Sequence, residues 1–411
     1  MARQMLVALG AAIPFIAGPA FADGAAQATR YSIQELSFPD DPRCVAEYAS
    51  HARVRALGAE GQVTGHVLCY VATGNPAFPF FQNARPFRWT RAGGAERLPE
   101  LAPPGDPLGS ESFGRDVNAD GTVIGLENGA EGSRAPLWPL GGGVSHAVEP
   151  VDCDGLTNVR GESINDAGTV AVTAARRGAD GSCAPHPVIR RQNGEEIVVP
   201  MPFALVASLN NREAITGNNA NVDAIRWTQG GGEVVLRASS EMPLTLARPW
   251  EINDRNEVSG TLQRWNDEGT CTAANEARFW TAGGRERRLP GLPDALHTFA
   301  FGLNLHRQVV GYSQFHATCQ PEQPELQRAV TWCDEQVLDL NRLIPRAAAR
   351  EVQLFLAIDV NDRGQILARG IKLNEPRQSC PGFAFDPVTG ELVYDPTPTC
   401  HAEYAFLLTP R

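Results

Sequence analysis

The sequence lacks every motif that would assign an enzymatic reaction to it directly. It has no nucleophile elbow, no HExxH, and no pair of acids that spacing would place on facing strands. Its glycine runs precede strand-like segments and never a helix, which excludes a phosphate-binding loop. No two cysteines have the CxxC spacing of a redox or zinc site. The sequence therefore identifies no catalytic residue and no cofactor-binding residue.

Positive charge and long apolar runs are also scarce. Lys and Arg total 36 against 47 Asp and Glu, giving a formal net charge of −11. Because an acidic surface repels phosphate backbones and anionic lipids, we predict no nucleic-acid partner and no membrane binding. After the N-terminal segment, no uncharged stretch is long enough to span a bilayer. The expectation that follows is a monomer whose partner is an unidentified protein or glycan.

The first residues have the three parts of an export signal. Arg3 precedes an apolar run from Met5 to Ala17, and Ala20-Phe21-Ala22 provides the A-x-A cleavage pattern. We predict cleavage near Ala22, so that residues 1–22 are a signal peptide and residues 23–411 form a single domain. The protein is then secreted or periplasmic. The alternative, a buried N-terminal helix, does not explain the three-part pattern.

Nine cysteines in an exported chain predict disulfides, and the odd number leaves at least one outside them. The sequence does not fix the connectivity. The pairings that we favour are Cys380 with Cys400, Cys153 with Cys183, Cys271 with Cys319, and Cys44 with Cys69. Cys333, directly after Trp332, is the cysteine that we expect to remain outside them.

One short pattern recurs seven times along the chain. An apolar residue precedes Asn, a Val or Ile follows the Asn by five positions, and in five of the seven copies Gly follows it by seven. The Asn positions are 118, 165, 210, 253, 304 and 361, and Gly58 takes this place in the first copy. The copies are 43 to 60 residues apart. That spacing suits a four-stranded propeller blade with variable loops.

A hairpin turn explains the pattern. Asn at the first position of a type I turn accepts hydrogen bonds from the main chain, and Gly three residues later adopts a positive φ. Together they make the three-residue hairpin loop with a glycine bulge. Asn256 suits the glycine position because Asn tolerates the left-handed region. Glu213 and Arg307 suit it poorly, and we expect those two turns to use another geometry.

An aromatic strand follows most of the turns. It reads FRWTRAGG from Phe87, PLWPLGGG from Pro136 and IRWTQGGG from Ile225, and it contains five of the seven tryptophans: Trp89, Trp138, Trp227, Trp280 and Trp332. A Trp at a fixed repeat position is typical of packing between blades. We therefore expect these side chains, and the apolar residues on both sides of each turn, to face the core.

These motifs resemble the HAF-repeat family of extracellular bacterial proteins of β-propeller type. That family pairs an IN-x-x-G-x-V-x-G turn with an A-F-x-W strand, and the seven turns match it well. The aromatic strand departs from the AF letters, reading PFRW, APLW, AIRW and ARFW. The stretch from Leu338 to Gly370 and the later YAFLLTP are closest to the family's ending. The resemblance implies an exported repeat protein, with no activity or catalytic residues to transfer.

The chain ends predict how the ring closes. Tyr404–Pro410 reads as a strand without its outer partner, and Arg30–Leu36 reads as an outer strand without inner ones. Pairing them would complete one blade and remove an exposed edge. The fold class we predict is an all-β, seven-bladed β-propeller. An eighth blade is the alternative if the insert between Cys380 and Cys400 supplies strands of its own.

One motif could bind a metal. Asp116, Asn118, Asp120, Gly121 and Glu127 match the calcium-binding loop of EF-hands. The same segment aligns with six turns that lack these acids, so an acidic turn is the interpretation that we prefer, and we predict no metal site. The spacings of His297, His306 and His316 match no common zinc site.

The function that the sequence favours is a binding or scaffolding module that uses loops on one face of the propeller. The alternative is a secreted hydrolase or lyase acting on an extracellular polymer at the central channel. Carboxylates, His and Arg with shifted pKa values, gathered at one mouth of the channel, would favour the enzyme.

Overall fold

The computed structural model describes residues 30–38, 51–75, 78–101, 111–129, 132–149, 157–177, 183–202, 204–237, 245–265, 272–317, 323–333, 336–379, 382–385, 392–395 and 399–411. The regular secondary structure of these residues is almost entirely β-strand. The helices among them are three single 3-10 turns, Pro324–Leu326, Leu340–Arg342 and Ala348–Arg350. Among the described residues no helix is long and apolar enough to cross a membrane. The predicted signal peptide, residues 1–22, lies outside this part of the chain.

Four of the sheets each contain four antiparallel strands in chain order. The first comprises β2 (His51–Leu57), β3 (Val63–Asn75), β4 (Phe78–Thr90) and β5 (Gly94–Arg97). The second comprises β15 (Leu205–Leu209), β16 (Ile215–Asn218), β17 (Ala224–Thr228) and β18 (Gly232–Arg237). The third comprises β19 (Thr245–Ile252), β20 (Val258–Trp265), β21 (Thr272–Trp280) and β22 (Glu286–Arg288). The fourth comprises β23 (His297–Leu303), β24 (Val309–Gln314), β25 (Gln327–Cys333) and β26 (Gln336–Asp339).

A larger, nine-stranded sheet contains two further groups of strands. One group is β6 (Glu111–Val117), β7 (Val123–Gly129), β9 (Pro136–Trp138) and β10 (Ser145–His146). The other is β11 (Thr157–Ile164), β12 (Val170–Arg177), β13 (Cys183–Arg190) and β14 (Glu196–Val198). The short β8 (Gly132–Arg134) joins the two groups, antiparallel to β7 and parallel to β11.

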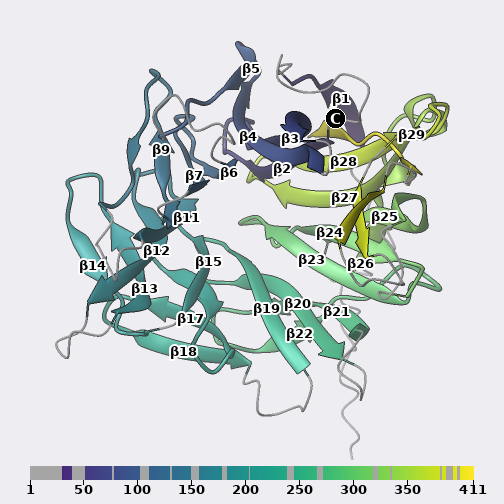
Figure 1. The fold of residues 1–411 in the computed structure, drawn as a ribbon. Helices are drawn as coiled ribbons and strands as arrows, with labels where there is room; N and C mark the ends of the chain where they lie inside the picture. The colour runs from purple at the N-terminus through teal and green to yellow at the C-terminus, as the bar shows by residue number, and fades with distance from the viewer. Residues whose placement is uncertain are drawn as a thin grey trace, which may run out of the picture.

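The two ends of the chain meet in one sheet. Its order is β1 (Tyr31–Leu36), β33 (Tyr404–Pro410), β28 (Ile366–Lys372) and β27 (Val352–Val360). β1 and β33 are antiparallel, with Tyr31 opposite Pro410 and Leu36 opposite Ala405. In Figure 1 the purple β1 lies beside the C-terminus. The predicted pairing of the terminal strands is confirmed.

The insert before β33 contributes two small sheets among the described residues. β29 (Gln378–Ser379) pairs with β32 (Thr399–Cys400), and β30 (Gly382–Phe385) pairs with β31 (Leu392–Asp395). Cys183 and Cys400 each take part in a disulfide bond. The partners that we predict for them, Cys153 and Cys380, lie outside the described residues, so the connectivity stays a prediction.

The sheets are arranged around a common centre (Figure 1). β2, β6, β11, β15, β19, β23 and β27 are nearest to it. Each of these strands contacts the next, and β27 contacts β2, so the innermost strands form a closed circle. This all-β arrangement is that of a β-propeller.

The repeated turns share one geometry. In each, the main-chain amide of the residue at the Asn position donates a hydrogen bond to the carbonyl four residues later. Asn210 donates in this way to Ala214 over 3.0 Å. The prediction that Glu213 and Arg307 would differ is wrong, because both adopt the left-handed conformation, at φ 59° and 61°. Ion pairs hold both side chains: Glu213 pairs with Arg191 at 2.6 Å and Arg307 with Glu257 at 2.7 Å.

The residues that flank each turn are buried, as predicted. Those before the Asn position are at most 7% exposed, and those five residues after it at most 2%. The five repeat tryptophans are also buried, at 6% exposure or less. The recurrent Gly seven positions after the Asn has a steric cause. A Cβ on Gly125 would overlap the carbonyl oxygen of Phe113 and the ring of Trp138.

Candidate functional site: the central channel

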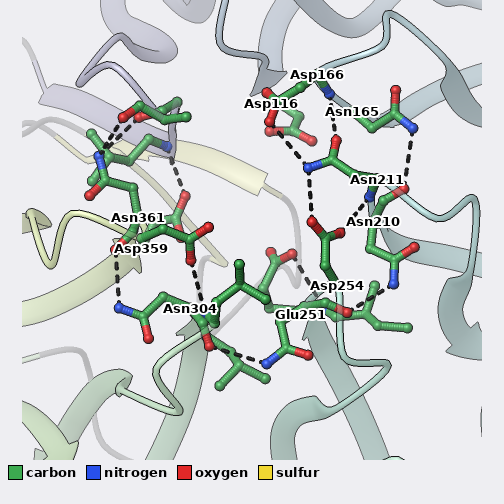
Figure 2. Close-up of a pocket in the computed structure, with 18 of the residues that line it drawn as sticks. Asp116, Asn165, Asp166, Asn210, Asn211, Glu251, Asp254, Asn304, Asp359 and Asn361 are labelled. Carbon is green, nitrogen blue, oxygen red and sulfur yellow. Dashed lines mark hydrogen bonds between the residues drawn. The ribbon is translucent and has the colours of Figure 1, made fainter.

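The turn asparagines link neighbouring sheets around one mouth of the channel (Figure 2). The Oδ1 atom of Asn210 accepts hydrogen bonds from two main-chain amides of its own turn, those of Arg212 and Ala214. Its Nδ2 atom donates to the carbonyl of Asn253, in the next turn, over 2.8 Å. The corresponding Nδ2 donations run from Asn165 to Asn210, from Asn253 to Asn304, from Asn304 to Asn361 and from Asn361 to Gly58.

Two turns depart from this pattern: the Nδ2 atom of Asn118 has no partner among the described residues, and the first turn is linked by another route. Gly58 has no side chain, and Gln62 donates instead, from Nε2 to the carbonyl of Ala119. The turn asparagines are 6% exposed or less, so their amides are structural. The polar side chains of the repeat therefore serve two purposes, since they shape their own turns and also connect neighbouring turns.

A second circle of side chains lies one residue further on, at the exposed rim of this mouth. Asp166 accepts a hydrogen bond from the main chain of Ala119, Asn211 from that of Asp166, and Asp254 from that of Asn211. Asp362 accepts one from Leu305. These residues line a hollow of about 150 Å³. Figure 2 shows three of them, Asp166, Asn211 and Asp254.

A β-bulge interrupts the inner strand of every repeat, three residues before the turn Asn. The pairing of β2 with β3 skips Arg55, and the pairing of β6 with β7 skips Arg115. A bulged residue is unpaired and bends its strand, which redirects its side chain. The residues skipped in all seven inner strands are Arg55, Arg115, Glu162, Ala207, Trp250, Phe301 with Gly302, and Ile358. Each of them lines a cavity of about 600 Å³ on the channel axis.

One arc of the cavity is cationic. Arg55 and Arg115 come from adjacent inner strands, and Arg53, Arg369 and His66 lie beside them. Burial lowers the pKa of Arg55 to about 10, with the charge of Arg115 as a second cause, so Arg55 is still protonated at pH 7. Burial, followed by the charges of the surrounding arginines, lowers the pKa of His66 well below its usual value. His66 is therefore neutral at pH 7.

The arginines of this arc differ in their pairing. Glu403 forms ion pairs with Arg53 and Arg369. Within the part of the chain that the structure describes, neither Arg55 nor Arg115 forms an ion pair, although the Glu162 carboxylate is near both. The Nε atom of Arg115 and the Nδ1 atom of His66 are buried and have no hydrogen-bond partner there. These groups are available to a ligand.

The opposite arc is mostly aromatic and apolar, although Arg248 of β19 also lines the cavity. Trp250 and Phe301 meet edge to face, with ring centroids 5.2 Å apart. Phe301 in turn stacks on Tyr312 at 5.9 Å. Ala207 and Ile358 complete this arc. Among the described residues, the Nε1 atom of Trp250 is buried and has no hydrogen-bond partner.

Three carboxyl groups form the floor of the cavity. Asp116, Glu251 and Asp359 each lie two residues before a turn Asn, and they line both the cavity and the smaller hollow at the Asn mouth. Asp116 accepts a bond from the Ser163 hydroxyl at 2.6 Å, and Glu251 accepts one from Ser208 at 2.5 Å. Burial raises the pKa of all three, that of Asp359 to about 7. Their mutual repulsion adds to the rise for Glu251 and Asp359.

The four residues of the calcium-loop motif have separate environments. Asp116 belongs to the channel floor, and Asn118 accepts a hydrogen bond from the main chain of Thr122. Asp120 bonds the same amide, at the exposed tip of the turn. Glu127, 1% exposed, accepts from the Ser112 hydroxyl and the Leu101 main chain. Both of these bonds go to Oε2 of Glu127, and its buried Oε1 has no hydrogen-bond partner among the described residues. No group of three metal ligands occurs in the described residues.

The sequence interpretation missed the channel residues. Arg55, Arg115 and Trp250 were hidden because nothing in an isolated strand marks a bulge. A signal was present, since the position three before the Asn varies from charged to aromatic, whereas the position directly before the Asn is apolar in all seven copies. Once seven copies are aligned, that position is the one to examine.

No protein-family model and no curated protein sequence matches the chain. Several solved structures are similar to it in arrangement. A putative TolB from Agrobacterium tumefaciens is 12% identical, with 63% of this chain and 88% of that chain covered and a TM-score of 0.37. The polysaccharide lyase Uly1 is 7% identical over 93% and 97%, with a TM-score of 0.40. YCF48 bound to D1 peptide is 8% identical over 92% and 97%, also at 0.40. Similarity this low carries no argument about ligand or activity.

Proposed function

We propose that this protein is a binding module that captures an anionic ligand in the central cavity of a seven-bladed propeller. The observation that carries the proposal is the pair Arg55 and Arg115, which two bulges direct into one cavity and which no described residue pairs. In a partly enclosed site, an arginine attracts an anion more strongly than it would in open water.

The blade count rests on the strands. The circle of inner strands has seven members, and the nine-stranded sheet contains two groups of four strands like the other sheets. The insert adds only two-stranded pairs among the described residues. We further propose that the chain is exported and is related to HAF-repeat proteins. The N-terminal pattern and the seven turns support this, and N-terminal sequencing of the secreted protein would test the cleavage near Ala22.

The cavity also explains how an acidic protein could bind an anion. The formal net charge of −11 describes the whole chain, whereas the cationic arc is concentrated within the channel. A field of one sign within a low-dielectric cleft is focused there. The ligand would therefore enter the channel, which differs from our expectation of binding by loops on one face.

Titration calorimetry with benzoate, benzylamine and inorganic sulfate tests the proposal. We expect saturable binding of the anions and none of the cation. The double variant Arg55→Ala/Arg115→Ala should lose this binding, whereas Arg346→Ala, at an exposed arginine outside the channel, should keep it. Thermal unfolding of both variants checks that they fold. Equal anion binding by the wild type and the double variant would refute the proposal.

A second candidate function is a lyase or hydrolase that acts on an extracellular polymer. It is favoured by the combination that we named as a criterion for an enzyme, namely carboxyl groups, His66 and arginines with shifted pKa values in one channel. A neutral imidazole beside arginines could accept a proton from a substrate whose negative charge those arginines hold. Incubation with acidic polysaccharides, followed by analysis of chain length, tests this function. His66→Gln should abolish any cleavage without abolishing binding.

A further inference from the structure

The cavity wall is divided into two arcs that face each other. In the circle of inner strands, β19 is three strands from β2 in one direction and three from β6 in the other. Trp250 of β19 therefore faces Arg55 and Arg115 across the channel, and all three side chains come from bulges at the same repeat position. A ligand held by its negative charge on one arc would present its opposite side to an aromatic wall.

The Trp250 side chain suits a flat ligand that also carries polar groups. Its ring packs edge to face against Phe301, and it is only partly buried. Its Nε1 hydrogen needs an acceptor that the described residues do not supply. Sugars have this dual character, because the C–H groups on one face of the ring pack against aromatic rings while the hydroxyls at the edge accept and donate hydrogen bonds.

The carboxyl groups of the floor narrow the class of ligand further. The oxygens of Asp116, Glu251 and Asp359 already accept hydrogen bonds from the fold, and these carboxyl groups line the cavity with further acceptor capacity. Carboxyl groups in this position favour a ligand that offers hydroxyl donors. An inorganic anion offers no donor, and a simple aromatic acid offers none at this depth. Of the ligand classes compared, only an acidic sugar satisfies the cationic arc, the aromatic arc and the floor together.

The floor also sets how far a chain can enter. Asp116, Glu251 and Asp359 separate the cavity from the hollow at the Asn mouth, since they line both. The hollow beyond the floor has a volume of about 150 Å³ against about 600 Å³ for the cavity, so the floor marks the narrow end of the channel. We propose that the ligand of the cavity is the terminal residue of an acidic glycan, with its acid group on Arg55 and Arg115 and its ring against Trp250. This inference rests on the proposed capture of anions.

The test is titration calorimetry with four probes: galacturonate oligosaccharides of two to six residues, sulfated galactan oligosaccharides, neutral galactan oligosaccharides, and inorganic sulfate. Acidic oligosaccharides should bind at least about tenfold more tightly than neutral ones of equal length, because the neutral chains leave the arginines unpaired. Comparing the uronate and the sulfated series tells which acid group is preferred. The affinity per chain should stay constant from the trisaccharide upward, since each chain has one terminal residue to bind.

Two variants separate this inference from the anion proposal. Trp250→Ala should weaken binding of acidic oligosaccharides by about tenfold and leave binding of sulfate unchanged, because sulfate has no ring to stack. Trp265→Ala, at the end of β20 and away from the cavity, is the matched control and should bind like the wild type. Arg55→Ala/Arg115→Ala should lose both ligands.

Three results would count against the inference. If sulfate binds through the arginines but acidic and neutral oligosaccharides bind equally, capture of anions stands and the acidic sugar is wrong. If the affinity per chain rises in proportion to length, internal residues bind and the restriction to chain ends is wrong. If no anion binds, both proposals fail.

Discussion

Except in Asn118, whose Nδ2 atom has no partner among the described residues, the side-chain amide of each turn asparagine acts at both ends. Its oxygen holds two main-chain amides of its own turn, and its nitrogen reaches the carbonyl of the turn in the next sheet. Such a residue contributes more to the stability of the fold than an asparagine that only shapes its own turn. Because it is buried, its removal also leaves the carbonyl it served without a partner.

We expect Asn210→Ala to lower the free energy of unfolding by about 2–3 kcal/mol, since a buried inter-sheet bond is lost together with the turn bonds. Asn219 offers a matched control. It makes the same two turn bonds, to Asn221 and Asp223, in the β16–β17 hairpin, but among the described residues its Nδ2 atom donates only within its own sheet, to Asp223 and Glu233. Asn219→Ala should therefore cost about 1 kcal/mol. Urea unfolding measures both, and equal losses would contradict an inter-sheet role.

The floor carboxyls predict a pH dependence of stability. The pKa of Asp359 is raised by burial from 3.8 to about 7 in the folded protein. The unfolded chain therefore ionises first as pH rises. The stability that the neutral carboxyl contributes is fully present below about pH 4 and is lost as the pH approaches 7, by up to about 4 kcal/mol.

Asp359→Asn, which does not ionise, should show a smaller fall in unfolding free energy between pH 4 and pH 7 than the wild type. Denaturant unfolding at a series of pH values measures this. The comparison uses the slope with pH, because the amide also loses one of the acceptors for Leu57 and Val360. An identical slope in both proteins would show that Asp359 does not titrate in this range.

Within a pair of strands, the bulge of the inner strand and the recurrent Gly of its neighbour act together. The bulge bends the inner strand, and the Gly on the neighbouring strand makes room for its carbonyl group, as at Gly125 beside Phe113. Side chains larger than hydrogen are excluded there. The same strand, β7, carries Gly129, where a Cβ would meet nothing within 4 Å.

We therefore expect Gly125→Ala to destabilise the protein by about 1–3 kcal/mol through overpacking, and Gly129→Ala to change its stability little. Thermal unfolding compares the two. Should both variants melt with the wild type, the close approach of the strands would not be the reason for the glycine.

Sequence reasoning succeeded for features that repeat and failed for those that vary. The turns, the buried tryptophans and the terminal strands were predictable, because each rests on local chemistry copied along the chain. Glu213 and Arg307 were misjudged because propensity disfavours φ near +60° for them, whereas distant partners, Arg191 and Glu257, stabilise them there. The cavity was not predictable, since Arg55 and Trp250 meet only once the ring is closed.

For the whole molecule, closure by β1 is decisive. Tyr31 and Leu36 are both 3% exposed, and the Tyr31 hydroxyl accepts a hydrogen bond from Gln308 of the neighbouring sheet over 2.9 Å. A chain without Tyr31–Leu36 would expose the edge of β33 and lose this contact.

Deleting Tyr31–Leu36 should lower the melting temperature sharply, and the exposed edge should promote association. Scanning calorimetry and light scattering measure the two effects. Ser32→Ala, which removes one side-chain bond on the same strand, is the mild comparison. An unchanged melting curve in the deletion would mean that the ring does not depend on this strand.

The bulges also make the protein easy to modify. The recurring residues supply turns, packing and inter-sheet links, whereas the seven bulge positions vary and contribute much of what the channel presents to a ligand. Those positions could be exchanged together, as in a combinatorial library, while the scaffold is left intact. A scaffold of this kind could be adapted to many different ligands by changing seven codons.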